Sequence, residues 1–129
     1  MRLNKFQRAW IAKLKSGTSR KFKGALRDPE RGAYCCLGVA CHLAGEPMHP
    51  DDVCLFGHPD VMNKLKLNSS MGQIDIDKVK PQWRSMLDLT DHTGNKAEYS
   101  LASLNDYGQI SHQKIGEFID ANREAVFVG

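Results

Sequence analysis

The sequence has no long apolar run, no secretory leader and few cysteines. No apolar run approaches the roughly 20 residues that a helix needs to cross a bilayer, and the opening MRLNKFQRAW lacks the continuous apolar segment of a signal peptide. Four cysteines in 129 residues are too few for a disulfide scaffold, and the adjacent Cys35 and Cys36 are poorly placed to pair with each other. These absences predict a cytoplasmic protein with free thiols and no membrane partner.

The common nucleotide and nucleic-acid signatures are also absent. The sequence has no Walker A motif and no G-x-G-x-x-G, and Gly32, Gly38 and Gly45 are too far apart to form a phosphate loop. It has no helix-turn-helix, ribonucleoprotein or zinc-finger motif. An apolar fraction of 41% and a charged fraction of 26% are ordinary for a globular chain. We therefore expect one domain over residues 1–129, with no catalytic residue and no cofactor assigned.

Charge is distributed very unevenly along the chain, although the net charge is only +3. Residues 1–31 contain ten basic and two acidic side chains, which gives +8, and the remaining residues contain eight and thirteen, which gives −5. A basic end of this kind attracts anionic partners, such as a nucleic acid, a nucleotide or an acidic protein surface. The alternative is that the two ends neutralise each other on folding.

Hydrophobic periodicity predicts a mainly α protein, with α+β as the alternative. Apolar residues from Leu3 to Leu14 recur at helical spacing and predict an amphipathic helix that ends near Gly17. A second amphipathic helix is expected behind Ser111, which has the character of an N-cap. The alternation IDIDKV at 74–79 suggests a short strand or an extended segment, and Asn105–Gly108 has the composition of a turn. We expect four segments: a basic helix and loop (1–31), a buried core segment (33–45), an irregular middle (46–80) and a C-terminal helical part (81–122).

The run AYCCLGVACHLAG at 33–45 holds three of the four cysteines and one histidine among apolar residues. Its composition favours a short buried central helix, in which thiols pack as small hydrophobic groups, although a strand at its start is also compatible. A zinc site is an alternative, because the spacing of Cys36, Cys41, Cys54 and His58 partly resembles that of a zinc finger. The helix interpretation argues against it, because residues five apart point about 140° apart on a helix.

A second enzymatic alternative is a cysteine nucleophile. Cys35 and Cys36 fall in the first turn of the expected helix, where backbone N–H groups lower the pKa of a thiol, and five histidines are available as bases. No histidine forms a recognisable local signature with them, and His112 is expected to be an exposed polar residue. Core packing is the competing interpretation of these thiols.

The stretch KLKSGTSRKFKGALR at 13–27 is the strongest candidate for a functional surface. Basic side chains interleaved with an aromatic ring can hold phosphates and stack on a base. The competing interpretation is a solvated surface that balances the acidic remainder of the chain. The predicted binding residues are Lys13, Arg20, Lys21, Phe22, Lys23 and Arg27.

Three stretches together carry a family resemblance: GALR at 24–27, AYCCLGVACHLAG at 33–45 and SLASLNDYGQISHQKIGEFIDAN at 100–122. They resemble a group of small, uncharacterised bacteriophage proteins with the pattern YCCLGVxC…LASLNDxG…IxxxI. Two positions depart from that group, since His42 stands where it often has aspartate and His112 where it often has an aromatic residue. The resemblance implies a shared fold and a phage origin, and it implies no catalytic residues.

Small phage proteins without an enzyme signature often act by binding. We therefore expect a non-enzymatic binding protein, a counter-defence inhibitor that engages a host protein, a nucleic acid or a signalling nucleotide through its basic segment. A cysteine- or zinc-dependent enzyme is the alternative function, and a structural or virion-associated protein is a further one. The sequence leaves the oligomeric state and the role of residues 46–99 open.

Overall fold

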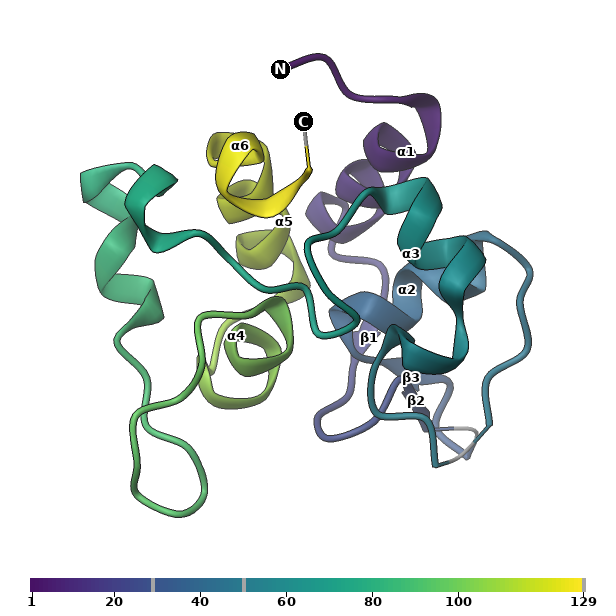
Figure 1. Ribbon diagram of the computed structural model, residues 1–129. Coiled ribbons are helices and arrows are strands. Elements are labelled where there is room, and N and C mark those ends of the chain that lie inside the picture. The colour runs from purple at the N-terminus through teal and green to yellow at the C-terminus, as the bar shows by residue number, and fades with distance from the viewer. Residues whose placement is uncertain (29, 50, 129) are drawn as a thin grey trace.

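The computed structural model describes residues 1–28, 30–49 and 51–128, so Pro29, Pro50 and Gly129 lie outside the described residues. Helices surround one buried cluster, and a small three-stranded sheet lies at the end of the molecule away from the two termini (Figure 1). Among the described residues, no helix has the length and apolar character needed to span a membrane. The helices are α1 (Lys5–Lys15), α2 (Cys36–Leu43), α3 (Pro59–Leu65), α4 (Leu101–Tyr107), α5 (His112–Ala121) and α6 (Arg123–Val126), and the 3₁₀ helices are η1 (Leu55–Gly57), η2 (Ile76–Lys78) and η3 (Pro81–Leu87).

The N-terminal helix α1 forms as the apolar stripe predicts. Asn4 and Gln7 cap it reciprocally: the Asn4 side chain accepts from the Gln7 N–H at 2.8 Å, and the Gln7 side chain accepts from the Asn4 N–H at 2.8 Å. Trp10 and Leu14 are fully buried on one face, and the chain leaves the helix at Gly17, whose φ is 67°. The prediction of an amphipathic helix ending near Gly17 is confirmed.

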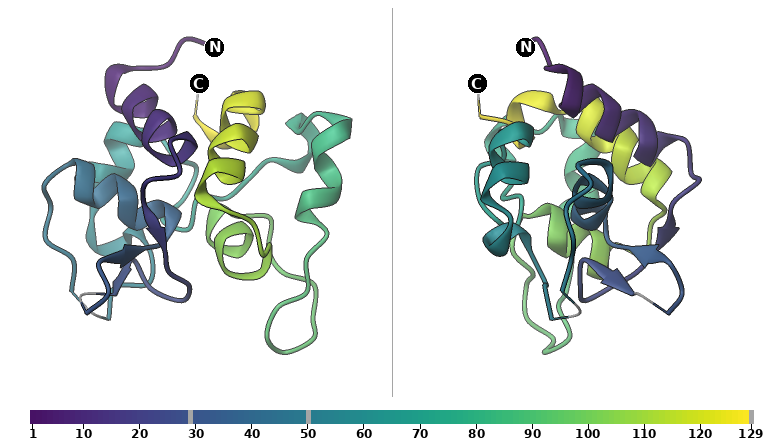
Figure 2. Two further views of the ribbon diagram at one scale, coloured as in Figure 1. Left: turned by 180° about the vertical axis from the view of Figure 1, so that it is seen from behind. Right: turned by 90° about the vertical axis from the view of Figure 1, so that its right-hand side faces the viewer.

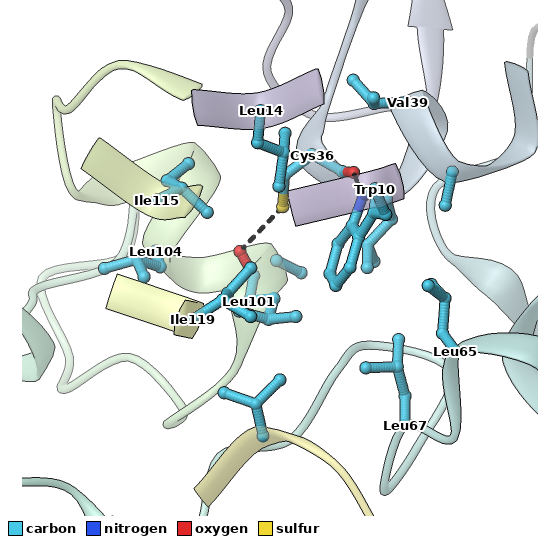
Figure 3. Packing of buried hydrophobic residues seen from close by; sticks show 14 of the residues in the cluster. Trp10, Leu14, Cys36, Val39, Leu65, Leu67, Leu101, Leu104, Ile115 and Ile119 are labelled. Carbon is cyan, nitrogen blue, oxygen red and sulfur yellow. Dashed lines mark hydrogen bonds between the residues drawn. The ribbon is translucent and has the colours of Figure 1, made fainter. Parts of the chain in front are cut away.

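The helix α2 is the buried central element that composition predicts. Cys35 is its N-cap, where the sulfur accepts from the Gly38 N–H at 3.3 Å. The Cys36 thiol donates to the Leu101 carbonyl at 3.6 Å, and the Cys36 carbonyl accepts from the Trp10 indole at 2.9 Å (Figure 3). Both cysteines thus serve as packing and capping groups, and the run at 33–45 is a buried helix preceded by a short strand.

The second amphipathic helix, α5, begins behind Ser111, whose side chain accepts from the Lys114 N–H at 3.1 Å. It lies side by side with α1 (Figure 2). Gly116 allows this close approach, because a Cβ there would lie 3.0 Å from the Leu14 Cβ and 2.8 Å from the Lys15 Cγ. The predicted N-cap and the second amphipathic helix are confirmed.

Two strands of the small sheet lie in the basic segment 1–31, and the central strand lies at the start of the run at 33–45, where a strand is the alternative expectation. β1 (Arg20–Lys21) pairs in parallel with β3 (Ala33–Tyr34), and β2 (Arg27–Asp28) pairs with β3 in antiparallel orientation, which gives the order β1-β3-β2. The strand expected at 74–79 is wrong, although Asp75 and Val79, on either side of η2 (Ile76–Lys78), are extended as the alternative predicts. The chain there forms η2, because the Asp75 side chain accepts from the N–H two residues later at 3.2 Å and stabilises a turn.

The turn expected at Asn105–Gly108 is also wrong, because α4 continues to Tyr107. Asn105 is fully buried; its side-chain oxygen accepts from the Cys36 N–H at 3.0 Å, and its amide donates to the Phe22 carbonyl at 2.9 Å. These distant contacts satisfy the side chain, so it does not compete with the backbone of its own helix. The C-cap of the helix is Gly108.

One buried cluster holds the segments together. It extends from Leu3 to Phe127, and the Phe127 ring meets the Trp10 indole edge-on at 6.2 Å between centroids. The expected irregular middle, 46–80, contains the short helices η1, α3 and η2, and helical structure continues beyond residue 122 into α6. The molecule is therefore a single α+β domain, mainly helical with one small sheet.

Gly38→Ala should strongly destabilise the fold. A Cβ at Gly38 would lie 1.8 Å from the Leu26 carbonyl oxygen, so α2 and the backbone of Leu26 would have to separate. We expect a loss of about 3 kcal/mol or more in the free energy of unfolding, measured by urea denaturation. Gly57→Ala is the matched control, because its Cβ would meet nothing nearer than 3.7 Å, and it should change stability by about 0.5 kcal/mol or less. Equal losses in the two variants would contradict this packing argument.

Candidate anion-binding surface

Three side chains form a row across the small sheet. Lys21 on β1 and Arg27 on β2 are both in register with Tyr34 on the central strand β3. Residues paired in this way project to the same face of a sheet, and the Arg27 guanidinium lies 5.9 Å from the centre of the Tyr34 ring. Two cations therefore flank an aromatic ring.

Lys21 and Phe22 hold this row against the rest of the molecule. The Lys21 ammonium donates to the Ile110 carbonyl in the link between α4 and α5, and the Phe22 N–H donates to the Tyr34 carbonyl at 2.8 Å. Burial lowers the pKa of Lys21, and the neighbouring charge of Lys23 lowers it further. Lys21 is therefore an anchor as well as a cation.

The six predicted binding residues differ in position and exposure. Arg20 and Lys23 are exposed, whereas Lys13 lies apart from the sheet, on α1. The other three are partly buried: Lys21, Phe22 and Arg27. We call the five residues on or beside strands β1 and β2 the basic sheet surface, which consists of Arg20, Lys21, Phe22, Lys23 and Arg27. Arg20 is in register with Ala33, so it projects to the opposite face of the sheet from Lys21 and Arg27.

Most cations of the basic end have no partner among the carboxylates of the described residues. Of the ten basic side chains in residues 1–31, two lie within 4.0 Å of a carboxylate in the described part of the chain. Lys15 is 3.0 Å from Asp120, and Arg31 is 3.6 Å from Asp28. The other eight make no such ion pair with a described residue. Ion pairing between the two ends, the alternative weighed from the sequence, therefore accounts for few of these charges.

The loop at 46–58 runs beside the basic sheet surface. Its Asp52 carbonyl accepts from the Leu26 N–H at 2.8 Å, directly before β2, and the two segments lie together at the lower right of the molecule in Figure 1. The loop exposes two apolar side chains, Val53 at 57% and Phe56 at 85%. Sequence reasoning missed both, because neither belongs to a periodic stripe and the surrounding prolines indicate only an irregular segment.

His58 fixes this loop by binding two carboxylates, an arrangement that we call the His58 clamp. The residue is 4% exposed; its Nδ1 lies 2.6 Å from Glu46 Oε1, and its Nε2 lies 2.9 Å from Asp52 Oδ2. Only the imidazolium form carries protons on both nitrogens, so it is the form that can donate to both carboxylates. Burial opposes that charge, but the bonds to Asp52 and Glu46 outweigh it and raise the pKa of His58. The bond from His58 also lowers the pKa of Asp52.

The structure does not bring the four zinc candidates together. Cys36 and Cys41 are buried in α2, the Cys54 thiol donates to the Ser70 hydroxyl at 3.7 Å, and both nitrogens of His58 face carboxylates. Within residues 1–28, 30–49 and 51–128, no three His, Cys, Asp or Glu side chains are arranged to hold a metal ion. The zinc-finger-like spacing of these residues therefore does not reflect a shared site. Two of the cysteines belong to a core helix, and the histidine belongs to the clamp.

The buried thiols are poorly suited to nucleophilic chemistry. Burial raises the pKa of Cys35 to about 12 and that of Cys41 to about 12, and it also raises the pKa of Cys36. At neutral pH these side chains are thiols rather than thiolates, which are the reactive form. Their environment favours core packing over the cysteine-nucleophile interpretation.

His112 is buried, so the expectation of an exposed residue is wrong. Only 2% of its surface is accessible, and neither ring nitrogen has a hydrogen-bond partner among the described residues. Burial and, after it, the positive charge of Lys21 lower the pKa of His112 to about 4. The ring is therefore neutral at physiological pH and adds no charge to the basic sheet surface.

A cleft of about 650 Å³ lies at the other end of the molecule, near the two chain ends. Arg2, Lys66 and Lys78 contribute positive charge to its lining, and Glu124 contributes a carboxylate. The amide of the buried Gln7 in its wall already bonds to the backbone of the protein. Among the described lining residues, no buried side-chain atom lacks a partner, so nothing in the cleft points to a ligand.

Comparison with known proteins places the chain in a family. The family model described as "Domain of unknown function (DUF8296)" matches residues 2–123. The chain belongs to this family. No curated protein and no solved structure matches it. Membership of a small family without an assigned function is thereby confirmed, whereas the phage origin and the YCCLGVxC…LASLNDxG pattern stay predictions.

The His58 clamp should make the stability of this DUF8296 chain depend on pH. The folded-state pKa of His58 is raised above its ordinary value of 6.5, so its contribution is complete below that value and is lost as pH rises through the raised pKa. Asp52 has a lowered pKa, so its contribution is lost only in acid. We expect the stability difference between wild type and His58→Gln, measured by urea denaturation, to shrink as pH rises from about 6 to about 9.

The control for this experiment is His49→Gln. The His49 side chain is 69% exposed, and the bond from this residue to Asp52 comes from the backbone N–H rather than the ring. Its stability difference from wild type should stay nearly constant over the same pH range. A His58→Gln difference that is equally flat would contradict the clamp.

The four cysteines should differ in their reactivity with iodoacetamide. Cys54 is partly exposed, whereas the other three are buried. We expect the native protein to be alkylated at Cys54 alone and the urea-unfolded protein at all four positions, as read by peptide mass spectrometry. Fast alkylation of Cys35 or Cys36 in the native protein would instead favour the cysteine-nucleophile interpretation.

Proposed function

We propose that the protein acts by binding an anionic partner through the basic sheet surface, without catalysis. The observation that carries this proposal is unpaired positive charge: eight of the ten cations in residues 1–31 make no ion pair with a described carboxylate. Such cations attract an anionic partner over about one Debye length, ~8 Å at physiological salt. Binding releases the partner's counterions, so the affinity should fall steeply with salt.

The residues of this surface would have different roles. Arg20 and Lys23 are exposed and would contact the partner directly. Lys21 and Phe22 bond to the helical part and to β3, so they would act mainly as positioning residues. The Arg27 guanidinium is partly buried beside a tyrosine ring, and this packing restricts its orientation.

The family resemblance supports a bacteriophage origin, and with it a target in the host cytoplasm. A small phage protein of this kind would blunt a host defence by occupying a host protein, a nucleic acid or a signalling nucleotide. An acidic protein surface, a nucleic acid and a nucleotide share the anionic chemistry for which the basic sheet surface is suited.

The enzyme and virion alternatives have less support. The raised pKa values of Cys35 and Cys41 work against a thiol nucleophile, and the four zinc candidates lie in different environments. No observation on the described residues favours a structural role in the virus particle.

Charge reversal at the two exposed cations tests the proposal. The double variant Arg20→Glu/Lys23→Glu should elute from a heparin column at clearly lower salt than wild type, and the slope of log affinity against log salt should fall by about 2. The thermal midpoint should stay nearly unchanged, because both side chains are exposed. Lys66→Glu/Lys80→Glu is the matched control, since it makes the same charge change at exposed positions outside the sheet.

Equal losses in the two double variants would mean that heparin responds to net charge alone, and they would overturn the basic sheet surface as the binding site. Lys21 is unsuitable for this test. Its ammonium bonds to the Ile110 carbonyl, so reversing its charge would disturb the fold as well as the surface.

A further inference from the structure

We propose that the anionic partner is a single-stranded nucleic acid and that Phe56 stacks on one of its bases. This inference rests on the proposed function and names the class of partner. Backbone phosphates would bind at Arg20 and Lys23, while the exposed ring of Phe56, on the neighbouring loop, would take a base. No sequence motif for nucleic acid is required, because stacking and phosphate contacts tolerate any base sequence.

Phe56 is the most exposed of the large apolar side chains in the described residues, at 85%. Within that part of the chain its ring takes part in no aromatic pair and no cation–π contact. An aromatic ring left in water forgoes the stabilisation that burial would give. Both faces of this ring are therefore available to a partner.

The loop that carries Phe56 is fixed on both sides of the ring. The preceding residue, Leu55, is fully buried, and its N–H donates to the Ser70 carbonyl at 2.9 Å. Two residues after the ring, His58 is held by Glu46 and Asp52 in the clamp. A ring presented on such a support loses little conformational entropy when a partner binds.

The same loop is joined directly to the basic segment. The hydrogen bond from the Leu26 N–H to the Asp52 carbonyl, 2.8 Å long, places the loop next to the start of β2. The clamp also moderates the negative charge of the loop, because the His58 imidazolium compensates part of the charge of its two carboxylates. The remaining loop carboxylate, Asp51, lies 3.6 Å from the His49 ring. A phosphate chain approaching the cations therefore meets less negative charge than the three loop carboxylates alone would present.

The combination of cations with a solvent-exposed ring favours nucleic acid over a protein. Arginine and lysine hold the backbone by charge, and an aromatic face takes any base by stacking. A duplex keeps its bases stacked on each other, so a ring of this kind selects single strands. A protein partner would use the same side chain differently, by inserting it into an apolar pocket, and the choice of substitutions separates the two cases.

Fluorescence anisotropy with a fluorescein-labelled oligothymidylate of about 15 nucleotides tests the proposal. In about 0.15 M salt we expect Phe56→Ala and Phe56→Leu each to bind at least about fivefold more weakly than wild type, and Phe56→Trp to bind as well or better. Leucine retains apolar surface but has no aromatic face, so it separates stacking from hydrophobic contact. Val128→Ala is the control for loss of an exposed apolar side chain, since Val128 is 52% exposed and lies near the other end of the molecule.

Four results would overturn the inference. They are wild-type affinity in Phe56→Ala, wild-type affinity in Phe56→Leu, equal affinity for the oligothymidylate and for a duplex of the same length, and no binding of the oligothymidylate by the wild-type protein.

The Arg20→Glu/Lys23→Glu variant distinguishes the stacking proposal from the proposal of anion binding. If it loses heparin and oligothymidylate binding while Phe56→Ala keeps both, anion binding at the basic sheet surface stands and the stacking role falls. If heparin retention depends on Arg20 and Lys23 but the oligothymidylate does not bind, the partner is not a single strand.

Discussion

The backbone of Leu26 joins three parts of the chain. Its carbonyl accepts from the Cys35 N–H at 3.1 Å, at the start of α2, and its N–H donates to the Asp52 carbonyl at 2.8 Å, in the loop at 46–58. α2 can approach this carbonyl only because Gly38 has no side chain. The basic segment, the central helix and the loop that carries Phe56 therefore take their relative positions from one backbone unit. A surface made of two-residue strands would otherwise have little to hold it in place.

The parts of the fold that sequence predicted are those with local causes. An apolar stripe and a cap define α1 and α5 within a dozen residues, and the buried composition of α2 excludes most other arrangements. The end of α4 has no local cause. Asn105 has the character of a turn residue, but its side chain bonds to Cys36 and Phe22, 69 and 83 residues away. The small sheet also could not be predicted from local sequence, because strands of two residues are too short to show a periodic pattern.

Charge and aromatic content predicted the candidate surface from the sequence, but they could not rank its members. Lys21 and Lys23 look equivalent in the sequence, yet the Lys21 ammonium reaches a carbonyl 89 residues away and Lys23 remains exposed. His58 was considered as a zinc ligand because of its spacing from cysteines. In the structure His58 does have two fixed partners, but they are the carboxylates of Glu46 and Asp52 rather than a metal ion. Phe56 had no local signal at all, since exposure depends on the whole fold.

The clamp links the stability of the loop to the electrostatics of the neighbouring surface. While His58 is an imidazolium, it binds two carboxylates and removes part of their negative field. When it loses its proton, one ring nitrogen can no longer donate, and the loop gains one unit of uncompensated negative charge next to β2. The loop is then held less firmly, and phosphate is attracted less strongly to the adjacent cations. Loop order and anion affinity should therefore weaken together as pH rises, because both depend on the same proton.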